Sequence, residues 1–102
     1  MGFNIILEDE HRSKVEQIDD PKGLLYGVLP EETNRTFQHL PFIDRYGDTV
    51  FNRPQMEPFL SEWGVLIAGS KDLEVRRLLA EVKRLATQVK DQVHLYLRFV
   101  GE

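Results

Sequence analysis

The pattern of apolar and polar positions is most regular in the last third of the chain. Apolar residues recur at helical spacing between Val75 and Val89, which predicts a long amphipathic helix from about Ser70 to Asp91. Apolar and polar residues then alternate over Val93–Val100, which predicts a final strand. One face of this strand carries Val93, Leu95, Leu97 and Phe99, and the other carries His94, Tyr96 and Arg98.

A second amphipathic helix is expected just before the long one. Its apolar face consists of Met56, Phe59, Leu60, Trp63 and Ile67. Asn52 and Gln55 have the spacing of a capping box, whereas Pro58 predicts either that the helix begins near Glu57 or that its first turn is irregular. Gly69 is a typical helix end and Ser70 a typical start of the next helix. So short a connection favours two antiparallel helices that pack on one face of a sheet.

The N-terminal third reads as two strands followed by a short helix. Phe3–Glu8 is rich in β-forming residues, and Lys14–Ile18 is a polar return strand expected at a sheet edge. Asp20 and Pro21 are suited to cap and begin a short helix that ends before Pro30. We expect the final strand to pair on both of its edges, and the first strand is the expected neighbour on one of them.

The middle of the chain is the least regular part. Residues 30–41 predict either a lid or a simple connection. Phe42-Ile43 and Val50-Phe51 flank the polar stretch 44–49, which favours a short β-hairpin with Gly47 at a positive φ angle.

These elements predict an α+β fold. We expect a small, mostly antiparallel sheet with an antiparallel helical hairpin on one face and the C-terminal strand within the sheet. A chain of 102 residues usually builds one core, so residues 1–102 are expected to form one globular domain.

Composition narrows the function classes. The chain has no cysteine, which excludes a disulfide scaffold, a thiolate metal site and a cysteine nucleophile, and which fits a cytoplasmic protein. No apolar run is long enough to span a membrane. The net charge is −4, with −6 in residues 1–69 and +2 in residues 70–102, so nucleic acid is an unlikely partner.

The main candidate binding site is the polar loop after Ile43. Arginine binds anions through its forked guanidinium, and tyrosine gives rigid contact area. The plainer interpretation, which we favour, is a surface turn whose polar groups bond one another. The candidate residues are Arg45, Tyr46, Asp48, Asn52 and Arg53.

A second candidate is the outward face of the final strand, with His94, Tyr96 and Arg98. Histidine beside a phenol can perform acid–base chemistry, although a half-exposed sheet face explains the same pattern and is favoured. We expect no metal and no cofactor. The loop around Gly47 lacks carboxylates at calcium-ligand positions, and the acidic stretch Glu8–Glu10 beside His11 is better explained as a solvated loop.

The leading hypothesis is a non-catalytic, cytoplasmic module that binds a protein partner, by analogy with acidic immunity or antitoxin proteins. An alternative is a small enzyme or ligand-binding domain with one pocket between the Arg45–Arg53 loop and the His94 face. A third hypothesis is a homo-oligomer formed through the sheet face around Ile6 and Tyr96.

Overall fold

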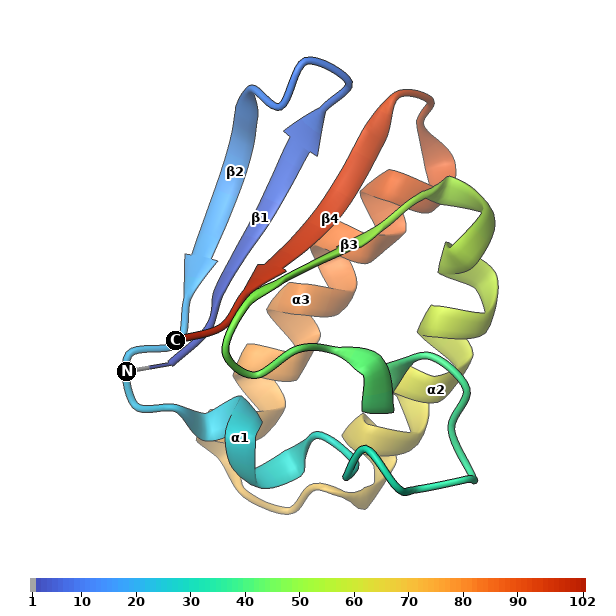
Figure 1. Cartoon of the computed structure of the whole chain (residues 1–102). Helices are drawn as coiled ribbons and strands as arrows, with labels where there is room; N and C mark the ends of the chain where they lie inside the picture. Colours follow the sequence, from blue (N-terminus) through green and yellow to red (C-terminus); the bar gives the residue numbers. More distant parts are fainter. Residues whose placement is uncertain (1) are drawn as a thin grey trace.

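The computed structural model describes residues 2–102 and has the predicted α+β architecture (Figure 1). Four antiparallel strands form one sheet in the order β2-β1-β4-β3. The strands are β1 (Asn4–Asp9), β2 (Lys14–Asp19), β3 (Asp48–Phe51) and β4 (Leu95–Val100). The helices are α1 (Leu24–Val28), α2 (Met56–Gly69) and α3 (Leu73–Asp91), with short 3-10 helices η1 (Leu40–Phe42) and η2 (Arg53–Gln55).

The two long helices lie on the same side of the sheet and leave its other face open (Figure 1). The C-terminal strand β4 pairs with β1 and with β3, and β2 is an edge strand, as predicted. The inward side chains of β1 and β4 are completely buried, as is Phe3 just before β1: these are Ile5, Leu7, Leu97 and Phe99.

Phe99 is the centre of the core. Its ring lies 5.9 to 6.2 Å, centroid to centroid, from the rings of Phe3, Phe51, Phe59 and Trp63. These four come from the N-terminus, β3 and α2, so one side chain of the last strand contacts three distant parts of the chain. The indole of Trp63 also donates a hydrogen bond of 2.8 Å to the carbonyl of Leu79, which joins α2 to α3.

The helix starts differ from the prediction in two places. Asp72, and not Ser70, caps α3, because its carboxylate accepts the N–H groups of Glu74 and Val75. The short helix α1 begins at Leu24 rather than at Pro21. Gly23 turns the chain at a φ of +69°, and the buried Asp20 carboxylate still caps the helix by accepting the N–H of Leu24.

The start of α2 agrees with the prediction. Asn52 and Gln55 form the capping box, and the first turn is the 3-10 helix η2, which then continues into α2. Pro58 lies early in α2, where a missing N–H costs little.

The predicted hairpin over residues 42–51 is wrong. Pro41 and Phe42 lie in η1, and β3 pairs with β4, with Phe51 opposite Leu97. Gly47 does not have a positive φ angle either. The physical reason is that Leu40, Pro41 and Ile43 bury their side chains, which holds this segment against the core instead of beside β3.

The final strand is shorter than predicted. It starts at Leu95, because the chain must reverse direction after α3, and His94 makes that turn at a φ of +64°. Val93, predicted to point into the core, is 60% exposed. His94 therefore lies in a turn and not on the sheet face.

Candidate functional site

The segment from the end of η1 to Tyr46 presents two aromatic side chains to solvent. Phe42 is 63% exposed and Tyr46 is 82% exposed, whereas Ile43 between them is buried. Together with Glu31 and Glu32, residues 41–46 line a hollow of about 450 Å³, which we call the aromatic pocket. Exposed aromatic side chains beside a hollow are typical of binding surfaces.

Internal hydrogen bonds fix the backbone of the aromatic pocket. The Asp44 carboxylate accepts the N–H of Tyr46 at 2.8 Å, and the Thr49 hydroxyl accepts the N–H of Asp44 at 2.8 Å. A Cβ atom on Gly47 would lie 2.7 Å from the Asp44 carboxylate, so a glycine suits this turn for lack of space. The Gly47 carbonyl accepts the N–H of Gly101, which ties the turn to the end of β4.

Arg45 is a structural residue of this segment. Its two terminal guanidinium nitrogens donate to the carbonyls of Tyr26, at 2.9 Å, and Leu29, at 3.0 Å. These carbonyls lie at the C-terminal end of α1, where helix carbonyls lack partners within the helix. The guanidinium that was a candidate for anion binding is therefore already hydrogen-bonded to the protein's own backbone.

The chain that leads into the aromatic pocket is held by Glu62 of α2. Its carboxylate accepts the N–H groups of Gln38, His39 and Leu40 at 2.8 to 3.1 Å, and the His39 ring lies 3.3 Å away. Burial acts to raise the pKa of Glu62, but these hydrogen bonds outweigh burial and hold its pKa below the usual range. Glu62 thus anchors the chain immediately before Pro41 and Phe42.

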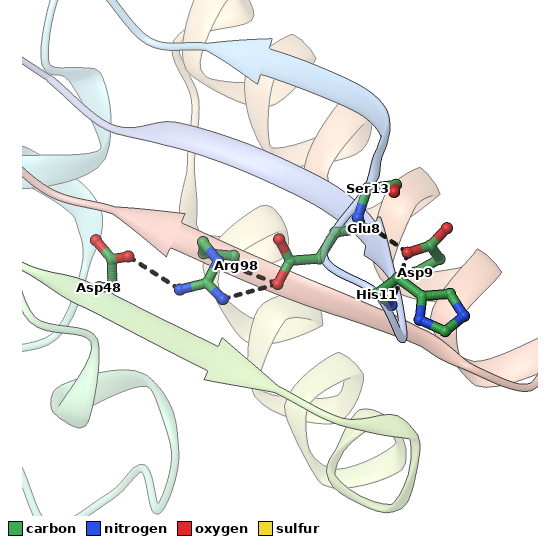
Figure 2. Close-up of polar contacts among 6 residues, drawn as sticks. All are labelled: Glu8, Asp9, His11, Ser13, Asp48 and Arg98. Carbon is green, nitrogen blue, oxygen red and sulfur yellow. Dashed lines mark hydrogen bonds and ion pairs between the residues drawn. The ribbon is translucent and has the colours of Figure 1, made fainter.

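The open face of the sheet carries an ion cluster across three strands (Figure 2). Arg98 of β4 donates to Glu8 of β1 at 2.8 and 3.1 Å and to Asp48 of β3 at 2.9 Å. The side chains of Arg98 and Glu8 are only 13% and 7% exposed. The hydrogen bonds to Glu8 are the largest cause that raises the pKa of Arg98. The negative charge of Glu8 and the contact with Asp48 raise it further, while burial acts to lower it. Arg98 and Asp48, both predicted to bind a ligand, bind each other.

Figure 2 also shows how the β1–β2 turn is held. The Asp9 carboxylate accepts the N–H groups of His11 and Ser13, both at 2.9 Å. The bond from Ser13 is the largest cause of the lowered pKa of Asp9; desolvation opposes it, and the bond from His11 lowers the pKa further. These contacts hold the β1–β2 turn, but Glu8, expected in a solvated loop, lies buried in β1 because it pairs with Arg98. No group of three or more potential metal ligands occurs within residues 2–102.

The remaining residues that the sequence predicts to bind a ligand do not converge, because each lies in a separate contact or position. Asn52 is used in the capping box, and Arg53 donates to the carbonyl of Lys90 at 3.1 Å. His94 lies 3.1 Å from the Glu10 carboxylate in an exposed pair. Tyr96 lies on the open sheet face, opposite Glu8 in the strand register.

The structure does not bring the two predicted sites into one cleft. Arg45 and Tyr46 lie at the end of β4 marked by Val100 and Gly101, whereas His94 precedes its other end. A strand of this length separates them by roughly 20 Å. Arg53, in contrast, donates to the carbonyl of Lys90 near the end of α3, so the Arg45–Arg53 loop is divided between the two ends of β4 and does not form the single pocket predicted with His94.

Sequence reasoning included Tyr46 but missed Phe42, Glu31 and Glu32. The sequence pattern predicts a strand at Phe42 and either a lid or a simple connection over residues 30–41. The available signal was Pro41, which cannot donate a hydrogen bond to a neighbouring strand and which begins short helical turns well.

Comparisons with protein families, with curated proteins and with solved structures found no match to this chain. Within residues 2–102, no helix is both long enough and apolar enough to cross a membrane.

Proposed function

We propose that this protein is a non-catalytic binding module whose protein partner docks on the aromatic pocket. The observation that carries the proposal is the exposure of Phe42 and Tyr46 on one hollow whose backbone is fixed from several sides. Aromatic side chains on a preformed surface lose little conformational entropy on binding, and they are enriched among the residues that dominate protein interfaces.

The state of the polar candidates supports this assignment. Arg45, Asn52 and Arg53 direct polar atoms to backbone groups of the protein itself, and Asp48 and Arg98 bind each other. What the loop presents outward is therefore aromatic surface rather than a set of converging catalytic groups. The acidic, cysteine-free composition fits a module that works in the cytoplasm, for example as an inhibitor of the immunity or antitoxin type.

A comparative pull-down from lysate of the source cells tests the proposal. The samples are the wild-type chain, a Phe42→Ala/Tyr46→Ala variant and a Val65→Ala/Val93→Ala variant. The last variant removes exposed apolar side chains outside the pocket and so is the matched control. Circular dichroism confirms that each variant is folded.

We expect a specific protein to bind the wild type and the control variant and to be lost with the pocket variant. A protein retained equally by all three samples would place the binding surface elsewhere and contradict the proposal.

A further inference from the structure

We infer that the aromatic pocket receives a positively charged side chain, so that the partner docks through a segment that carries arginine or lysine. This inference rests on the proposed function and adds the chemistry of the partner. Its basis is the combination of carboxylates and exposed aromatic rings on the lining of one hollow.

The charges of the lining favour a cation. Glu31, Glu32 and Asp44 contribute three carboxylates, and within residues 2–102 neither Glu31 nor Glu32 forms an ion pair with another side chain. Arg45 is the one cation of the lining, and its guanidinium donates to two backbone carbonyls at the end of α1. The lining thus has an excess of negative charge that an incoming cation can neutralise.

The aromatic rings favour the same ligand chemistry. A guanidinium or ammonium group is attracted to the face of Phe or Tyr, and arginine also stacks on such a face. Phe42 and Tyr46 are both largely exposed in the pocket, and the bond from the Tyr46 N–H to Asp44 holds an aromatic residue next to a carboxylate. An arginine side chain can use both kinds of group at once, with its planar head against a ring and its N–H groups toward carboxylates.

The size of the hollow is consistent with this ligand. About 450 Å³ lies in the range of pockets that enclose small ligands, which is enough for one long side chain. An apolar side chain would remove water from the carboxylates without forming hydrogen bonds to them. An anionic side chain would be repelled by the same carboxylates. The charged cluster of the sheet face, Glu8 with Arg98 and Asp48, is already paired internally and offers no comparable site for a cation.

Amide chemical shifts of the labelled protein provide the test. The probe is the acetylated and amidated pentapeptide Gly-Gly-Arg-Gly-Gly, and the control peptide carries citrulline, which keeps the shape of arginine without its charge. The protein samples are the wild type, Glu31→Gln/Glu32→Gln and Glu57→Gln/Glu81→Gln. The last variant changes the net charge equally at exposed positions on α2 and α3.

We expect the arginine peptide, and not the citrulline peptide, to shift the amides of residues 42–46. Binding should weaken about threefold or more in Glu31→Gln/Glu32→Gln and stay unchanged in Glu57→Gln/Glu81→Gln. Absence of shifts at these amides, or equal weakening in both variants, would overturn the inference.

The two proposals can fail separately. A partner that depends on Phe42 and Tyr46 but is captured equally by Glu31→Gln/Glu32→Gln would support the docking site and refute the cationic side chain. An arginine peptide that binds as expected, while no partner depends on Phe42 and Tyr46, would support the cation site and refute the proposed function.

Discussion

Tyr26 and Arg45 each donate a side-chain hydrogen bond to the other's backbone carbonyl. The Arg45 guanidinium donates to the Tyr26 carbonyl at 2.9 Å, and the Tyr26 hydroxyl donates to the Arg45 carbonyl at 3.0 Å. The Tyr26 ring also stacks on Phe3, with 4.8 Å between ring centroids. This reciprocal pair connects α1 to the loop of the aromatic pocket, so the shape of that loop depends on a helix about twenty residues earlier in the chain.

Loss of this pair should lower stability in a coupled way. Tyr26→Phe removes the hydroxyl that donates to the Arg45 carbonyl and accepts the N–H of Glu102, and should reduce the free energy of unfolding by about 1–2 kcal/mol. Arg45→Met should cost about 1.5–3 kcal/mol. The double variant should cost less than the sum, because both changes disrupt one connection. Urea unfolding measures these values. Arg53→Met, which removes one exposed bond to Lys90, is the control and should change stability by less than about 0.5 kcal/mol.

The ion cluster on the sheet face gives a second prediction. Arg98→Met leaves the Glu8 carboxylate in a largely buried position without its cation and should lower the free energy of unfolding by about 2–4 kcal/mol. Asp48→Asn should cost less than about 1 kcal/mol, because that carboxylate is half exposed. Arg98→Met/Glu8→Leu should recover much of the loss. Equal costs for Arg98→Met and Asp48→Asn in urea unfolding would contradict this account of the cluster.

Two glycines should respond to alanine in opposite directions. A Cβ atom at Gly101 would overlap the carbonyl oxygen of Arg45, a backbone atom that cannot move without the loop, so Gly101→Ala should lower the melting temperature. A Cβ atom at Gly64 meets nothing within 4 Å, and alanine favours the interior of α2. Gly64→Ala should therefore stabilise by about 0.5–1 kcal/mol. A Gly101→Ala midpoint equal to or above that of the wild type would refute the close approach at Gly101, and a lowered Gly64→Ala midpoint would refute the open space at Gly64.

Glu62 should contribute to the dependence of stability on pH. Its pKa is lower in the folded protein than its ordinary value of 4.5, so its contribution is present above that pH and is lost as the pH falls through the folded pKa. Glu62→Gln should lower the free energy of unfolding by about 1–2 kcal/mol at pH 7, and the difference from wild type should shrink below about pH 4. Asp9 and Glu16 also have lowered pKa values, so the free energy of unfolding of Glu62→Gln should still fall in part as the pH is lowered. Urea unfolding at several pH values measures this. A difference that stays constant from pH 7 to pH 3 would show that the charge of Glu62 is not what holds residues 38–40.

The sheet and the long helices could be predicted because their apolar residues follow regular periods. The alternation of Leu95, Leu97 and Phe99 identifies the buried face of β4, and the spacing from Val75 to Val89 identifies that of α3. Each pattern reflects burial on one side of an element, which the amino-acid sequence records directly.

The aromatic pocket could be predicted only in part because tertiary contacts decide its shape. The sequence shows that Arg45 and Tyr46 lie in a polar turn, but the partners of Arg45 are carbonyls of α1 and that of Asp48 is Arg98. Similarly, the periodicity of β4 extends to Val93 and His94, whereas the reversal after α3 requires His94 to adopt a left-handed conformation. Non-local contacts of this kind leave no period in the sequence.

The most direct measurement of the proposed function is site-specific photocrosslinking in lysate of the source cells. A photoreactive benzoylphenylalanine is placed at position 42 or 46, and at positions 65 and 93 as exposed controls outside the pocket. Our account predicts a covalent adduct with one and the same protein from positions 42 and 46, and none with that protein from the controls. An adduct from positions 65 or 93 without one from the aromatic pocket would contradict it.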